Sequence, residues 1–146
     1  MQHEYMSVIP YINSALTQFE IKHNVKVIFA SDAGSRSYGW ASSTSDFDVH
    51  LIYVHTPIYY MTIQEREKSF NNEGEQEQFM VDIPRKHLEQ TTDETIVQIE
   101  VNIASFDVKH ALQLFARSNP SVIHMLVSPI VFIDKCHEHF SGPLQE

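Results

Sequence analysis

The sequence has one cysteine and no long apolar run, and each shortage excludes a class of protein. With Cys136 alone, no disulfide can form within the chain, which favours a reducing compartment. No stretch approaches the ~18 apolar residues that a membrane helix needs. The N-terminus lacks the basic start and apolar core of a signal peptide. We therefore expect a cytoplasmic protein without a membrane partner.

Basic residues are also scarce, at 10 lysines and arginines against 19 aspartates and glutamates, a formal net charge of -9. An extended nucleic-acid surface normally needs clustered basic side chains, so none is expected. A nucleotide is still compatible with this charge because a bound metal ion supplies positive charge locally. The 146 residues, of which 42% are hydrophobic, fit one domain over 1–146, whether minimal or truncated.

Hydrophobic periodicity predicts both helices and strands, and hence an α/β protein. The expected helices cover residues 7–23, 105–116 and 121–127, and the expected strands cover 25–30, 46–54, 79–83, 95–104 and 129–133. A polar stretch at 71–78 is expected to be a flexible loop, and 141–146 an unstructured tail. Alternation within 95–104 places Glu100 and Asn102 on one face of their strand.

The segment that indicates chemistry is GSRSYGWASSTSDFDV, residues 34–49. Gly34 lets the backbone approach a ligand, and Ser35 adds a hydroxyl beside exposed N–H groups, a combination that suits phosphate oxygens. Asp46 and Asp48 are two residues apart on a predicted strand, so their carboxylates point the same way and can share a hard cation such as Mg²⁺ or Mn²⁺. His50 lies on the same predicted face.

This segment resembles the Gly-Ser and Asp-x-Asp signature of the DNA polymerase β-type nucleotidyltransferase superfamily. It is most similar to the predicted nucleotidyltransferases associated with RNA ligases, and FDVKHALQLFARSNPSVIHMLVSPIVF in the second half resembles the helix–Asn-Pro–helix segment of that group. The resemblance covers residues 25–132, except for a poor match over 61–94. It implies a mixed β-sheet flanked by helices, a metal held by Asp46 and Asp48, and triphosphate contacts from Gly34 and Ser35.

Enzymes of this type usually carry a third carboxylate on a later strand, and the resemblance places that position at Asn102. An amide oxygen can coordinate a metal but does not accept a proton at neutral pH. Glu100 is on the same predicted face and is the candidate replacement. Arg36 is either a phosphate ligand or the partner of a surface acid. His50, where the group usually has arginine, is a candidate phosphate contact.

We therefore expect a metal-dependent nucleotidyltransferase with Asp46, Asp48 and Glu100 as catalytic residues. Its partners would be a nucleoside triphosphate and an unidentified hydroxyl acceptor, which the sequence leaves open among an RNA end, a small molecule and a protein. The alternative is a catalytically degenerate member that binds a nucleotide or a protein partner, which Asn102 favours. A third and weaker alternative, an RNA-binding module, is opposed by the acidic charge.

Overall fold

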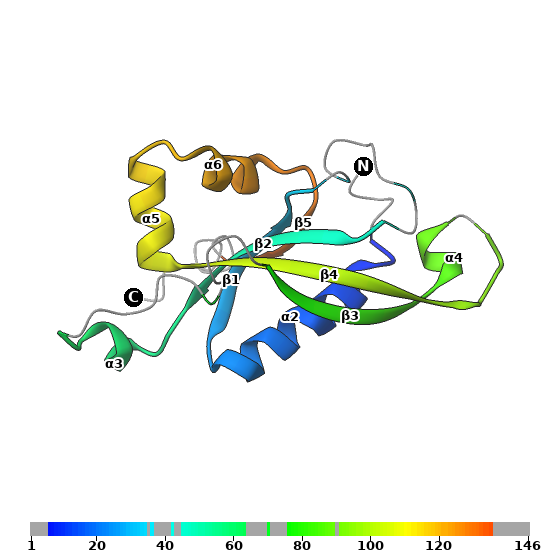
Figure 1. Cartoon of the computed structure of the whole chain (residues 1–146), viewed down its shortest axis with the longest axis horizontal. Coiled ribbons are helices and arrows are strands. Elements are labelled where there is room, and N and C mark those ends of the chain that lie inside the picture. The colour runs from blue at the N-terminus through cyan, green and yellow to red at the C-terminus, as the bar shows by residue number, and fades with distance from the viewer. Residues whose placement is uncertain are drawn as a thin grey trace, which may run out of the picture.

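Five strands form one mixed sheet in the order β3-β4-β2-β1-β5, as the computed structural model shows (Figure 1). The structure describes residues 6–34, 36, 42, 45–63, 70, 76–89 and 91–135 of the chain. The strands are β1 (Lys26–Asp32), β2 (Phe47–Val54), β3 (Glu77–Pro84), β4 (Ile96–Asp107) and β5 (Val131–Asp134). β2 and β4 run parallel, and the other neighbouring pairs run antiparallel. The expected mixed sheet flanked by helices is confirmed.

Helix α2 (Ile9–His23) covers one face of the sheet (Figure 1). Pro10 lies in its first turn, where the missing N–H has no intrahelical partner to lose. The helix ends at Asn24, whose φ of 53° is left-handed, a conformation that asparagine tolerates. The main core lies between this helix and the sheet face that carries Phe47 and Val49.

Two further helices cover part of the opposite face: α5 (Val108–Ala116) and α6 (Pro120–Val127) (Figure 1). A smaller core joins them to the sheet, with Phe29 and Ile52 packed against Met125 and its neighbours. Asn119 begins α6 by accepting a hydrogen bond from the Ser121 N–H at 3.0 Å. These two helices leave the opposite face of β3 open, where Met80 stays 47% exposed.

The fourth strand is longer than expected, and the prediction of a helix from residue 105 was wrong at its start. Ser105, Phe106 and Asp107 continue β4 because the parallel pairing with β2 persists, ending at the pair Tyr53↔Asp107. The helix begins only at Val108, after Asp107 caps it by accepting from the Lys109 N–H at 2.9 Å. Asp107 is thus both the last residue of β4 and the cap of α5.

The third strand also begins earlier than expected. Glu77 and Gln78, assigned to a loop over 71–78, are the first residues of β3 because they pair with the middle of β4. Residues 71–75 of that stretch and the expected tail at 141–146 lie outside the described part of the chain. Two short helices were not expected from the sequence, α3 (Pro57–Tyr60) and α4 (Arg85–Leu88).

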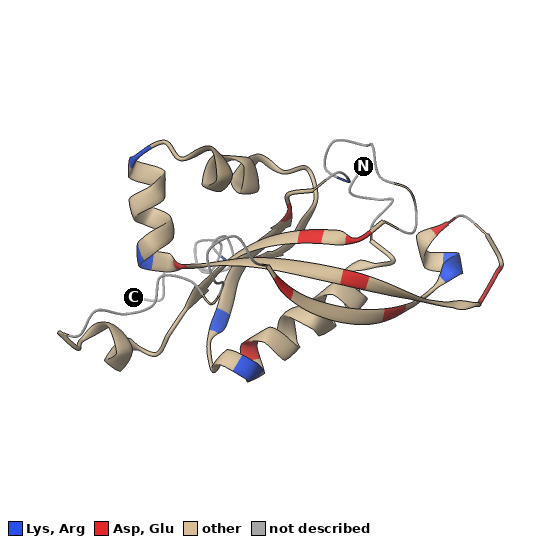
Figure 2. Ribbon diagram, viewed as in Figure 1, with Lys and Arg blue, Asp and Glu red and all other residues tan. Residues whose placement is uncertain are grey.

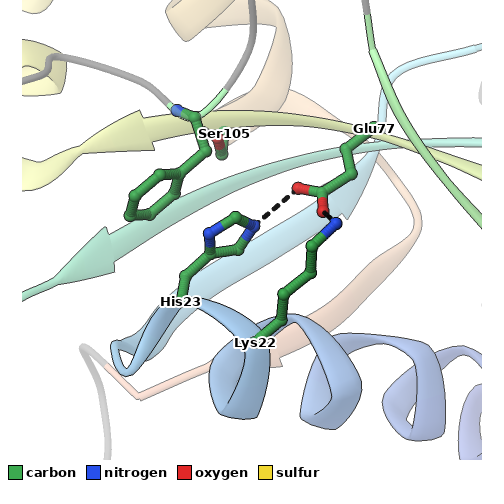
Figure 3. Close-up of polar contacts among 5 residues, drawn as sticks. Lys22, His23, Glu77 and Ser105 are labelled. Carbon is green, nitrogen blue, oxygen red and sulfur yellow. Dashed lines mark hydrogen bonds and ion pairs between the residues drawn. The ribbon is translucent and has the colours of Figure 1, made fainter.

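A polar contact ties the end of α2 to the start of β3 (Figure 3). The Glu77 carboxylate accepts from Lys22 Nζ and contacts His23 Nε2 at 2.8 Å. The His23 ring stacks on Phe70, with ring centroids 3.9 Å apart, and the Phe70 N–H donates to Ser105 Oγ at 3.3 Å. This contact fixes the helix against the strand that flanks the open face.

No helix in the described part of the chain is long and apolar enough to span a bilayer.

Candidate functional site

The candidate site lies where β2 and β4 run side by side. Their parallel register places Asp48 directly opposite Asn102, with Phe47 opposite Val101. Facing residues on adjacent strands point to the same side of the sheet. The carboxylate of Asp48 and the amide of Asn102 therefore share the face opposite α2. Both side chains are half-buried, while Phe47 and Val101 on the other face are fully buried.

Gly34 lies directly against the Asp48 side chain. A Cβ atom built on this glycine would sit 2.4 Å from Asp48 Oδ2 and 2.8 Å from Asp48 Cβ, closer than real Cβ contacts come. Only glycine therefore fits at this position unless the backbone shifts. The turn after β1 and the Asp-x-Asp strand thus meet, which the sequence pattern predicts for a shared phosphate and metal site.

Hydrogen bonds from neighbouring backbone and side-chain groups hold the turn that carries Gly34. The Gly34 N–H donates to Asp32 Oδ1 at 3.0 Å, and the Ala33 N–H donates to the Asp48 carbonyl oxygen at 2.8 Å. Ser128 Oγ, which follows α6, donates to the Asp32 carbonyl oxygen. The Asp32 side chain is fully buried. These contacts join β1, β2 and the end of α6 at one point.

Asp32 is a site residue that the sequence reasoning missed. Aspartate commonly accepts a hydrogen bond from the backbone N–H two residues further on, which produces a turn. An aspartate two residues before a glycine was therefore a usable signal for this turn.

Arg36 is buried, at 4% exposure, and its contacts lie within the protein. The guanidinium donates from Nη2 to the Ser45 carbonyl oxygen, and its Cζ lies 3.9 Å from the centroid of the Phe47 ring. A cation this close to a ring face is stabilised by the ring quadrupole. Arg36 thus contacts the residues on both sides of Asp46. These contacts are neither the phosphate contact nor the surface ion pair that the sequence left open for Arg36.

Acidic residues gather on the same region of the sheet (Figure 2). Asp46 is exposed and Glu100 half-buried, and they immediately precede the facing pair Phe47↔Val101. None of the strands β2, β3 and β4 contains a lysine or arginine. A triphosphate at this place would therefore need a cation to offset the carboxylates.

His50 lies two residues beyond Asp48 on β2 and is half-buried. Its ring centroid is 5.9 Å from that of Phe106, and its Nδ1 is buried without a hydrogen-bond partner among the described residues. Burial lowers the pKa of His50, and the nearby Asp48 charge acts in the opposite direction. A neutral imidazole is expected near pH 7, so His50 carries little positive charge for a phosphate.

The donor set fits a metal that is completed by a ligand rather than one enclosed by protein. No group of three or more His, Cys, Asp or Glu side chains within the described residues is arranged to hold a metal ion. Mg²⁺ commonly uses one or two carboxylates and takes its other ligands from water and substrate phosphates. Asp46 and Asp48, with the amide of Asn102 alongside, meet that lesser requirement.

Several residues singled out in the sequence lie outside the described part of the chain. Ser35 is the most important of them, and its expected phosphate contact stays a prediction. Of the remaining site residues, Gly34, Asp48 and Asn102 come together, Asp46 and Glu100 flank them, and His50 lies toward Phe106.

Comparison with known proteins adds a family to this geometry. The sequence pattern described as the RNA repair pathway DNA polymerase beta family matches residues 8–141. The chain is also 29% identical over 119 residues to the uncharacterized protein YcgL of Bacillus subtilis (strain 168). That alignment covers 82% of this chain and 37% of the relative, so the chain spans well under half of that protein's length. No solved structure matches the chain significantly.

Proposed function

The chain belongs to the RNA repair pathway DNA polymerase beta family, and from this and the site geometry we propose a metal-dependent nucleotidyltransferase. It would transfer a nucleoside monophosphate from a nucleoside triphosphate to a hydroxyl acceptor and release pyrophosphate. The observation that carries the proposal is the contact between the Gly34 turn and the Asp48 side chain. That contact supports a single site for phosphates and a metal.

In this proposal the two aspartates and the turn bind different parts of one ligand. Asp46 and Asp48 hold Mg²⁺ or Mn²⁺, which offsets phosphate charge when bound. Gly34 and Ser35 present backbone N–H and hydroxyl donors to the β- and γ-phosphates. Arg36 and His50 are the other candidate nucleotide contacts. The Arg36 side chain is buried, and the His50 ring lies near that of Phe106. Asn102, which faces Asp48, offers the ligand an amide oxygen and an amide N–H group.

The transfer itself exchanges one phosphorus–oxygen bond for another. The acceptor hydroxyl oxygen bonds to the α-phosphorus, the bond from that phosphorus to the bridging oxygen breaks, and pyrophosphate leaves with its electron pair. Glu100 is the proposed acceptor for the hydroxyl proton, since it is the half-buried carboxylate on β4 nearest to Asn102. The acceptor is an RNA end, a small molecule or a protein side chain.

The direct test is pyrophosphate release from each nucleoside triphosphate with Mg²⁺ or Mn²⁺, and a panel of the three acceptor classes. Release that Asp46→Asn and Asp48→Asn abolish, while each variant keeps its unfolding temperature, supports the proposal. The matched control is Asp82→Asn on the exposed face of β3, which should leave release unchanged. Release that survives both site variants contradicts it.

A catalytically degenerate protein is the second candidate, and one observation favours it. The residue opposite Asp48 on β4 is Asn102, which cannot take a proton at neutral pH. Such a protein would bind a triphosphate and Mn²⁺ and release no pyrophosphate with any acceptor. Calorimetric binding beside a null activity assay identifies this outcome.

A further inference from the structure

We propose that Arg36 is a positioning residue for Asp46, and not a ligand of the triphosphate. The inference rests on the proposed function, because it assigns Asp46 a metal to hold. Residue 46 itself is exposed and precedes β2, so the sheet ladder does not fix its backbone. Other contacts must therefore hold residue 46 where it enters the strand.

The contacts of Arg36 supply that restraint from both sides. Its guanidinium donates to the carbonyl oxygen of Ser45, the residue before Asp46. The guanidinium carbon, Cζ, also lies 3.9 Å from the ring centroid of Phe47, the residue after Asp46. Phe47 is fully buried in the main core. Through its contact with this ring, Arg36 connects the segment around Asp46 to the packed core.

Burial argues against a direct phosphate role for the same side chain. Arg36 is 4% exposed, whereas a phosphate ligand needs N–H groups that reach the ligand. A guanidinium also keeps its charge under burial, since it does not deprotonate in proteins. The positive charge of Arg36 therefore persists in the interior, between Ser45 and the Phe47 ring.

Lysine cannot reproduce these contacts. Its ammonium is a compact and strongly hydrated charge, so it does not at once stack flat on a ring and donate sideways to a carbonyl. The substitution Arg36→Lys keeps the charge and loses the geometry, and Arg36→Met loses both. A phosphate ligand and a positioning residue should respond to this pair of variants in opposite ways.

The test measures Mn²⁺ affinity in the absence of nucleotide, by electron paramagnetic resonance of the whole chain. If Arg36 positions Asp46, both Arg36→Lys and Arg36→Met should weaken Mn²⁺ binding by about tenfold or more, as loss of a ligand's supporting partner typically does. The backbone amide signals of Asp46 and Phe47 should shift in both variants. Arg117→Lys and Arg117→Met, at an exposed position after α5, are the matched controls and should change neither.

The proposal is overturned if Mn²⁺ binds both Arg36 variants as tightly as wild type, while triphosphate affinity falls in Arg36→Met and recovers in Arg36→Lys. That pattern would identify a phosphate ligand. If wild type binds no Mn²⁺, the proposed function fails, and the amide shifts alone then decide whether Arg36 orders residue 46. Thermal unfolding of each variant comes first, and Arg36→Lys supplies the test if Arg36→Met does not fold.

Discussion

Asn102 faces Asp48 across the parallel pair of strands at the centre of the sheet. The position that should complete a set of three carboxylates thus carries an amide, at the place where the resemblance puts it. The strand register makes residue 102 a direct neighbour of Asp48. The substitution Asn102→Asp, which replaces one amide nitrogen by an oxygen, can therefore distinguish an active protein from a degenerate one.

Replacing this amide by a carboxylate should strengthen cation binding. Asn102→Asp is expected to tighten Mn²⁺ binding by about tenfold, because the charge count of the ligands sets the affinity of hard-cation sites. Without metal, the added charge should lower the free energy of unfolding by about 1 kcal/mol through repulsion. Titration with Mn²⁺ and urea denaturation measure the two effects.

The control for this substitution is Gln113→Glu, an amide-to-acid change at an exposed position of α5. It should leave both quantities unchanged. If pyrophosphate release rises with Asn102→Asp, the wild-type amide limits turnover. Unaltered Mn²⁺ affinity in Asn102→Asp would count against a metal site next to Asp48.

The close contact at Gly34 predicts a site that does not accept a single added methyl group. In Gly34→Ala the new Cβ would fall 2.8 Å from Asp48 Cβ, so the turn or the strand has to move. We expect Mn²⁺ affinity to drop by about tenfold or more, as for other lost supports of a metal ligand. Gly34→Ser has the same Cβ and one more atom and should be at least as damaging. Wild-type affinity in both variants would show that the contact is unimportant.

Asp32 should act on the same turn through its hydrogen bond to the Gly34 N–H. Asn retains an oxygen acceptor, so Asp32→Asn should keep slow hydrogen exchange of the Gly34 amide. Asp32→Ala removes the acceptor and should speed that exchange. Hydrogen–deuterium exchange followed by nuclear magnetic resonance reads the difference. Equal exchange rates in the two variants would contradict this role.

The phenol of Tyr60 gives a pH-dependent signature far from the site. The pKa of Tyr60 is raised to about 12, chiefly by burial and also by the hydrogen bond to Asp107, while the hydrogen bond from the His55 N–H acts in the opposite direction. Because the folded pKa lies above the ordinary value of about 10, this phenol stabilises the fold below pH 10. That contribution should disappear as the pH rises from about 10 through 12.

Ultraviolet titration of wild type against Tyr60→Phe isolates this phenol among the six tyrosines. Asp107→Asn should lower the pKa of Tyr60 toward the ordinary value, and asparagine still caps α5. A titration of Tyr60 near pH 10 in the wild type would contradict the expected shift.

The sequence predicted the elements well wherever a local rule decides them. The alternation predicted for residues 95–104 is found in β4. Helix α2 has Pro10 in its first turn and ends before Asn24, as the preferences of these two residue types favour. The gains of β4 at Ser105 and Phe106 come from pairing with Leu51 and Ile52, which local propensity does not contain.

The site shows the same division. Spacing placed Asp46, Asp48 and His50 on one side of a strand, and the resemblance located Asn102. The surroundings of Arg36 depend on a buried ring eleven residues away, and sequence spacing carries no information about that contact. The surroundings of Asp32 likewise depend on Ser128 and Ile130, in the segment between α6 and β5, almost a hundred residues further along the chain.

The irregularity in β1 between Val27 and Phe29 couples the two cores. Val27 and Ala30 enter the core under α2, whereas Ile28 and Phe29 both pack toward α5 and α6, so the inward and outward phases exchange at that step. Strict alternation from Val27 onward would turn Phe29 toward α2 and Ala30 toward α5 and α6, the wrong layer for each. One spare residue there thus keeps the downstream turn in phase with its partners.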